Sequence, residues 1–252
     1  MSSASVAFVF TAAAFVPSPP LLVPELSGRT DDEFAPVRAA VLDTGRALAE
    51  RARRWVVVGV ADGGSRPPAP ESVGSFLGYG ADVRVRLSPV PSADPPDVEV
   101  DAEWPLAALV AGWIRGRVGP DVTASVVLLD EECTPEAAAA AGAAVRRELD
   151  AVTEPVALLV VADGAITLTE RAPGALDLRA PEVQAELDEA LRSGRRDLLA
   201  ALDPSLCREL GIGGRAPWQA MAGAFMDDPT QTTSDYCGAP YGVGYHVGTW
   251  LP

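Results

Sequence analysis

Short apolar runs alternate along the chain with longer segments in which apolar residues recur every three or four positions. The runs at 55–60, 125–129 and 156–161 are uninterrupted, which is typical of strands buried on both faces. Residues 5–10 form a first strand of this kind, and 241–250 form a β-rich last one. Residues 83–87 alternate apolar and charged side chains, which predicts a half-exposed strand near a sheet edge.

Helix signals lie between these strands. The sequence Thr30–Glu33 fits a capping box and predicts a helix to about residue 53, while Thr134 followed by Pro135 predicts one to about residue 149. Apolar spacing predicts further helices at 106–114, 181–192, 197–202, 204–210 and 218–225. The Gly-, Pro- and Asp-rich segments 61–80 and 88–103 are expected to be irregular. Strands that alternate with helices predict an α/β layered sheet, and no long polar stretch divides residues 1–252 into two domains.

Charge and composition exclude several classes of enzyme and several kinds of partner. The formal net charge is −15, and all 20 basic residues are Arg. A chain without Lys cannot be a Schiff-base lysine enzyme and cannot carry a Walker A phosphate loop. The negative charge argues against nucleic acid or an anionic membrane as a partner, and no apolar run reaches the roughly 18 residues that span a bilayer.

The cysteines and the amino-terminal segment indicate a cytoplasmic location. The three cysteines, Cys133, Cys207 and Cys237, are odd in number and widely spaced, which argues against a disulfide framework and for a reducing compartment. The apolar segment 5–16 is not preceded by any basic residue, so it lacks the charged start of a secretory signal.

Aspartates follow three of the predicted strands. They are Asp62, Asp130 and Asp163, and two of the strand ends nearly repeat as VADGG at 60–64 and VADGA at 161–165. In α/β sheets, ligands bind beyond the carboxyl ends of the strands, where carboxylates hold a hard cation such as Mg²⁺ or act as general bases. The structural alternative is that each Asp starts a turn or caps a helix.

The single histidine, His246, is the candidate for any imidazole chemistry. The chain has no G-x-S-x-G elbow to supply a serine nucleophile, and the cysteines form no C-x-x-C pair for a structural zinc site. Alternation places His246 on the face opposite Tyr245 and Val247, which favours a packing or surface role. The nearby glycines at 242, 244 and 248 are expected to allow close packing of the backbone.

The opening of the chain shows a family pattern. A first apolar strand is followed by VPSPPLLVPEL at 16–26, and DG sequences follow two later strands at 62–63 and 163–164. These features resemble the B-type subunits of class III extradiol ring-cleavage dioxygenases. The ending, with WQAMAGA at 218–224 and APYGVGY at 239–245, is similar to an uncharacterised high-GC bacterial branch of that superfamily. The resemblance implies a single three-layer α/β domain over residues 1–252, with a largely parallel or mixed sheet flanked by helices.

The resemblance also implies an Fe(II) site, from which this chain departs. Family enzymes bind iron through two histidines and a carboxylate, and a further histidine is the acid–base. Ser18 takes the position of the first histidine ligand, and neither 61–65 nor 163–168 contains a histidine. The family's glutamate ligand has no assigned counterpart here.

We therefore expect a protein that has lost iron-dependent ring cleavage and has no cofactor. It would keep a cleft near Ser18, Asp62, Gly63, Asp163 and Gly164 that binds a small molecule or a protein partner. Family enzymes can be oligomeric, so a homo-oligomer is compatible with the resemblance. Two alternatives stay open: a hydrolase that uses Asp62 and Asp163 with Mg²⁺ or another hard divalent cation, and a purely structural or interaction protein with a filled cleft.

Overall fold

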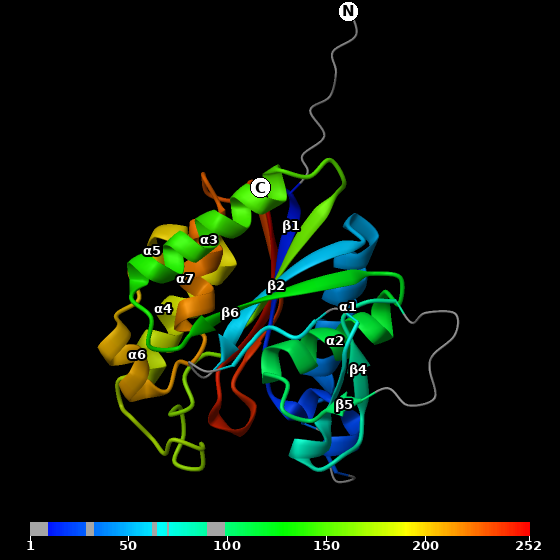
Figure 1. Cartoon of the computed structure of the whole chain (residues 1–252). Coiled ribbons are helices and arrows are strands. Elements are labelled where there is room, and N and C mark those ends of the chain that lie inside the picture. Colours follow the sequence, from blue (N-terminus) through cyan, green and yellow to red (C-terminus); the bar gives the residue numbers. More distant parts are fainter. Residues whose placement is uncertain (1–9, 29–32, 62–64, 70, 90–98) are drawn as a thin grey trace, which may run out of the picture.

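The main sheet of the protein is mixed, as expected. The computed structural model describes residues 10–28, 33–61, 65–69, 71–89 and 99–252, and within these residues the main sheet has six strands in the order β6-β2-β7-β1-β9-β8 (Figure 1). The strands are β1 (Phe10–Val16), β2 (Arg54–Ala61), β6 (Thr123–Asp130), β7 (Val156–Val161), β8 (Gln231–Gly238) and β9 (Tyr245–Leu251). Strands β6, β2, β7 and β1 are parallel to one another, whereas β9 runs antiparallel to β1 and to β8.

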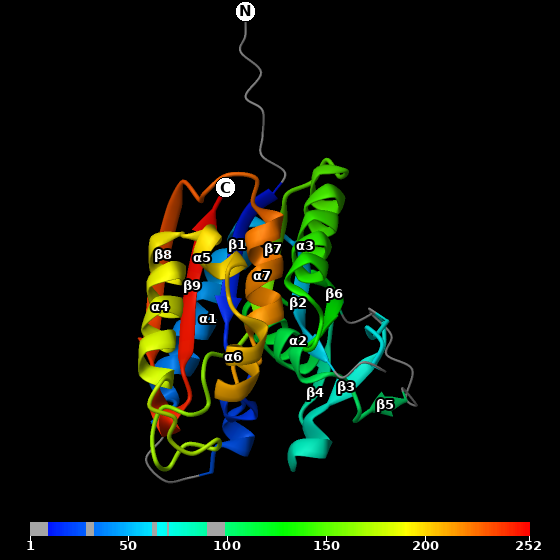
Figure 2. The same ribbon diagram turned by 90° about the vertical axis from the view of Figure 1, so that its left-hand side faces the viewer.

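Helices cover both faces of this sheet, which confirms the three-layer α/β fold (Figure 2). Helices α1 (Ala35–Arg51) and α2 (Leu106–Val118) lie on one face. On the other face are α3 (Pro135–Asp150), α4 (Ala180–Ser193), α5 (Arg196–Ala200), α6 (Pro204–Leu210) and α7 (Arg215–Ala224). Because side chains alternate along a strand, Ala14 and Val16 of β1 join the core beneath α1 and α2, while Ala13 and Phe15 join the opposite core.

A second, three-stranded sheet corrects the expectation that 61–80 and 88–103 are irregular. Its order is β4 (Arg84–Arg86), β3 (Val73–Ser75) and β5 (Val100–Asp101). Close packing explains why these glycine-rich segments are ordered. A Cβ atom at Gly74 would lie 2.4 Å from the ring of Trp104, and one at Gly112 of α2 would lie 3.1 Å from Val85. The absence of side chains at both positions lets this sheet lie directly on Trp104 and α2.

The helix caps agree well with the sequence. The Thr134 hydroxyl accepts a hydrogen bond from the Ala137 N–H at 3.2 Å, and Asp203 accepts one from Leu206 at 2.7 Å. Helix α1 begins at Ala35 and has Phe34 as its N-cap residue, while residues 30–32 of the predicted capping box lie outside the described part of the chain. Among the described residues, no helix is long and apolar enough to cross a membrane.

Two strands differ from the sequence pattern. In the described residues the first strand runs from Phe10 through the alanines to Val16, past its predicted end at residue 10. The rest of the predicted strand, residues 5–9, lies outside the described part of the chain. Strand β8 was not predicted, since its sequence QTTSDYCG is polar and half-exposed. It is an edge strand that pairs with β9.

Candidate functional site at the carboxyl ends of the strands

The site begins where β1 and β7 end side by side. These strands are parallel, and Val16 is paired with Val161, so Ser18 and Asp163 each lie two residues beyond a paired position. The Ser18 backbone N–H donates to Asp163 Oδ1 at 2.9 Å, and the Ser18 hydroxyl donates to Oδ2 in a short hydrogen bond. The expected convergence of these two segments is confirmed, and we call Ser18 and Asp163 the strand-end pair.

The carboxyl group of this pair titrates close to neutral pH. Burial raises the pKa of Asp163 to about 6, against the opposing effect of the two hydrogen bonds from Ser18. Tyr245, at the start of β9, is buried and packs on Phe34 in a T-shaped arrangement with the ring centroids 5.2 Å apart. Burial and the neighbouring Asp163 raise the pKa of the Tyr245 phenol, so it stays protonated. A carboxyl group with a pKa near 6 can donate or accept a proton under physiological conditions.

The loop that carries Asp163 is fixed by backbone hydrogen bonds. The Gly164 N–H donates to the Gly244 carbonyl at 2.8 Å, and the Gly214 N–H donates to the Asp163 carbonyl at 3.1 Å. A Cβ atom at Gly164 would lie 2.2 Å from Oε1 of Gln184, and one at Gly244 would lie 2.3 Å from the same atom. Gly164 is therefore needed for packing against Gln184, and the loop holds Asp163 in one place.

A pocket of about 510 Å³ lies at the same edge of the sheet, beyond the ends of β2 and β6. Ala61, Tyr79, Glu103, Trp104 and Glu131 are among the residues that line it. Strands β6, β2, β7 and β1 are consecutive in the sheet, so this pocket and the strand-end pair share one row of carboxyl ends. Asp62 and Gly63, the other predicted site residues, lie outside the described residues.

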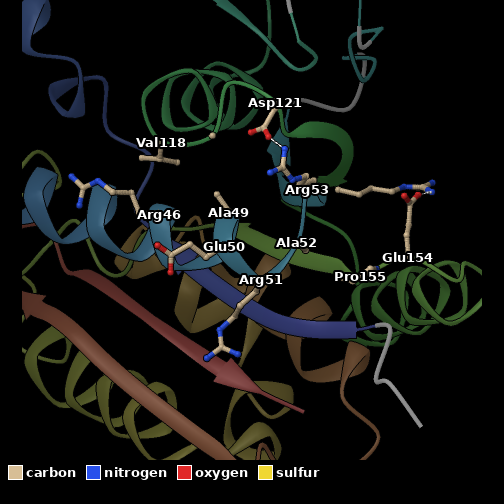
Figure 3. Close-up of a pocket in the computed structure, with 12 residues that line it drawn as sticks. Arg46, Ala49, Glu50, Arg51, Ala52, Arg53, Val118, Asp121, Glu154 and Pro155 are labelled. Carbon is tan, nitrogen blue, oxygen red and sulfur yellow. Dashed lines mark hydrogen bonds and ion pairs between the residues drawn. The ribbon is translucent and has the colours of Figure 1, made fainter. Parts of the chain in front are cut away.

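A second pocket, of about 580 Å³, lies at the opposite end of the sheet and involves no predicted site residue (Figure 3). It is formed where α1 ends and where β2, β6 and β7 begin. Its arginines are partly neutralised, since Arg53 is paired with Asp121 and Arg54 with Glu154 at 3.1 Å. The two ends of the sheet thus differ in charge: acidic groups line the pocket at the carboxyl ends, and arginines gather at the amino ends.

His246 lies on the face of the sheet opposite Tyr245, as predicted. Its ring meets the Phe15 ring in a T-shaped arrangement with the ring centroids 5.7 Å apart, and the residue is 3% exposed. Both ring nitrogens have partners: Nδ1 is 3.2 Å from Asp188 Oδ1, and Nε2 is 3.1 Å from the Ser234 hydroxyl. The sequence analysis missed Asp188 and Ser234, since one reads as an ordinary polar position of a helix and the other belongs to the unpredicted strand β8.

Comparisons with known proteins support the fold and go no further. The chain matches no known family profile and no curated protein. Among solved structures, it is similar to the crystal structure of an uncharacterized protein from Escherichia coli K12, with a TM-score of 0.52 and 12% sequence identity. The match covers 96% of this chain and 100% of that chain. At this identity, the likeness shows that the two share a fold.

Proposed function

We propose that the protein binds a small hydroxylated molecule at the carboxyl ends of its strands and does not catalyse iron-dependent ring cleavage. In this proposal it is a relative of the B-type subunits of class III extradiol dioxygenases. The observation that carries the proposal is the strand-end pair: Ser18 and Asp163 present a hydroxyl group and a titratable carboxyl group at the edge of the sheet where such folds bind ligands.

The donor atoms at this edge argue against iron. Ser18, in the position of the family's first histidine ligand, offers a hydroxyl oxygen, and Asp163 offers carboxylate oxygens that already accept two hydrogen bonds from Ser18. Imidazole suits iron, whereas oxygen donors suit hard ions such as Mg²⁺. His246 contacts Phe15 and Asp188 on the opposite face from Tyr245, so within one chain it does not complete an iron site.

The pocket suggests which molecules would bind. Glu103 and Glu131 give it a negative charge, Trp104 and Tyr79 supply aromatic surface, and no arginine is among its described lining residues. An uncharged or cationic aromatic hydroxyl compound fits this character better than an anion. Neither Ser18 nor Asp163 is among the lining residues of the pocket, but its presence at this edge of the sheet favours binding over a purely structural role. The hydrolase alternative also requires Asp62, which lies outside the described residues.

Calorimetric titration of the full chain with three catechols tests this proposal. The probes are catechol, its cationic aminomethyl derivative 3,4-dihydroxybenzylamine, and the anion protocatechuate. We expect the cation and the neutral compound to bind at least tenfold more tightly than the anion. Ser18→Ala and Asp163→Asn should each weaken binding, while Ser27→Ala should not, because its hydroxyl bonds only locally to the Pro24 carbonyl. Equal or tighter binding of protocatechuate would contradict the charge argument, and binding that neither variant weakens would contradict the assigned site.

An activity assay separates binding from ring cleavage. With Fe(II) and ascorbate under air, we expect neither catechol nor protocatechuate to give the yellow ring-fission product, and after anaerobic reconstitution we expect no bound iron that Ser18→Ala or Asp163→Asn removes. Turnover that is lost in Ser18→Ala or Asp62→Asn would show an active iron site. In that case, a histidine from a second copy of the chain would be the first ligand to look for.

A further inference from the structure

Three metal-ligand side chains meet on the side of the sheet away from Tyr245. Asp188 of α4, Cys237 of β8 and His246 of β9 each place a potential ligand atom within 4.8 Å of the others. We call these three residues the hairpin cluster. Neither Cys133 nor Cys207 belongs to it. A cluster with a single cysteine has no C-x-x-C spacing, so a search of the sequence for cysteine pairs does not find it.

An irregularity in β8 builds this cluster. The pairing of β8 with β9 shifts between Ser234 and Tyr236, which leaves Asp235 as an extra residue, a β-bulge. Asp235 reaches toward α1, where it accepts a hydrogen bond from Thr44 at 2.7 Å, while Ser234 contacts His246 on the other side. Because of the bulge, Ser234 and Cys237 share a face although they are three residues apart. Cys237 is also the direct cross-strand partner of His246.

Without a metal ion, protons occupy the space between the three side chains that a cation could take. Asp188 accepts a hydrogen bond from Gln184 at 2.7 Å, and its Oδ1 atom lies 3.2 Å from Nδ1 of His246. A divalent cation that replaces the thiol proton would balance the charges of the Asp188 carboxylate and a Cys237 thiolate.

We propose that Asp188, Cys237 and His246 bind a divalent transition-metal ion, with Zn²⁺ as the best match. A tetrahedral zinc site with bonds of about 2.0–2.1 Å to oxygen and nitrogen separates those two ligand atoms by roughly 3.3 Å. The Asp188 Oδ1 to His246 Nδ1 distance is 3.2 Å, so these ligands already lie at the spacing of one tetrahedral edge. A donor set of sulfur, nitrogen and oxygen also selects zinc over Mg²⁺.

Outer hydrogen bonds orient two of the ligands in the way that metal sites require. Gln184 is buried and holds the Asp188 carboxylate, and Ser234 bonds to the second ring nitrogen of His246. Cys237 is exposed, so an ion could enter from solvent and keep a water molecule as its fourth ligand. Arg192 is close enough to Cys237 to interact with it electrostatically, but its positive charge is paired with Glu189.

Cobalt titration of the chelator-treated full chain tests the site, because four-coordinate Co²⁺ reports its ligands in the absorption spectrum. We expect one Co²⁺ per chain with strong visible bands and a thiolate-to-cobalt charge-transfer band, and displacement of Co²⁺ by Zn²⁺ but not by Mg²⁺. Cys237→Ser should remove the charge-transfer band, and Asp188→Asn and His246→Gln should each weaken binding at least tenfold. Ser234→Ala should weaken it by about 10- to 100-fold, as for other outer-shell partners. Cys133→Ser is the matched control and should bind as the wild type does.

Several outcomes would overturn the proposal. One is the absence of cobalt binding by wild-type protein whose circular dichroism shows it to be folded, and another is a charge-transfer band that survives in Cys237→Ser. The same side chains also form a Ser234–His246–Asp188 hydrogen-bond chain, the arrangement of an activated serine. If the protein binds no cobalt and a fluorophosphonate labels Ser234, the cluster activates a serine nucleophile and is not a metal site.

Discussion

The strand-end pair lies beyond the carboxyl ends of β1 and β7, whereas the hairpin cluster lies on the face of β9 away from Tyr245, and the two sites are built differently. Two parallel strands that end side by side form the first, so the register of β1 and β7 alone brings Ser18 and Asp163 together. A helix and a bulged antiparallel hairpin form the second. Gln184 joins them, since it accepts from Ala165 N–H at 2.8 Å and donates to Asp188 at 2.7 Å. The comparison shows that one buried amide can support two sites whose chemistry is separate.

The largest expected effect comes from removing this link. Gln184→Ala would leave the Ala165 N–H without its acceptor, take a donor from Asp188 and open a cavity among buried side chains. We expect the free energy of unfolding to fall by about 2–4 kcal/mol, from the unpaired buried group and the cavity together. Urea unfolding measures this. Glu186→Ala, at an exposed position of the same helix, is the control and should change stability by less than about 0.5 kcal/mol.

The second prediction concerns the strand-end pair alone and the way in which Asp163 makes stability depend on pH. The pKa of Asp163 is raised in the folded state to about 6 from an ordinary value of 3.8, so the folded protein binds the proton more tightly than the unfolded chain. The free energy of unfolding therefore falls as pH rises from about 4 to about 6, and the loss is complete above that range. Asp163→Asn cannot ionise, and we expect it to exceed the wild type in stability by about 1–3 kcal/mol at pH 7.5 but not at pH 3.5.

Unfolding at several pH values between 3.5 and 7.5 checks this difference. Asp150→Asn is the matched control: Asp150 is exposed and paired with Arg146 at the end of α3, and its replacement should leave the shape of the stability profile unchanged. If Asp163→Asn is instead less stable than the wild type at pH 7.5, the hydrogen bonds from Ser18 outweigh the cost of burying the charge.

The different origins of the two sites explain what the sequence could predict. The buried strands 55–60 and 156–161 and the cap at Thr134 are local signals, and the structure has them where the pattern placed them. Ser18 and Asp163 could be expected to meet because parallel strands end at one edge. Asp188 and Cys237 could not, because their meeting depends on the bulge at Asp235 and on a polar edge strand with no apolar alternation. In the small sheet, the edge strand β4 lies within the predicted strand 83–87, whereas β3 and β5 were missed for a similar reason, since Trp104 packs on Gly74 from outside its own segment.

A smaller effect is expected at the other half of the strand-end pair. Ser18→Ala removes a hydroxyl that donates to the Asp163 carboxylate and thereby favours its ionised form. The pKa of Asp163 should rise further, and stability at pH 7.5 should fall by about 1 kcal/mol, the ordinary worth of one hydrogen bond. Carbon NMR of the Asp163 carboxyl group during a pH titration measures the first effect. A lower pKa in the variant would mean that the serine hydroxyl accepts from, rather than donates to, the carboxyl group.

The smallest expected effect tests whether the two sites are independent. His246→Ala removes the imidazole of the hairpin cluster but leaves Gln184 bonded to Ala165, so the loop that carries Asp163 keeps its support. Catechol affinity at the strand-end pair should therefore stay within a few-fold of the wild type, even though the same variant should lose cobalt binding. A tenfold loss of catechol affinity, about 1.4 kcal/mol, would show that His246 supports or contacts the strand-end ligand. The hairpin cluster and the strand-end pair would then form one site connected through Gln184, because β9 places Tyr245 and His246 on opposite faces and gives them no direct path through the sheet.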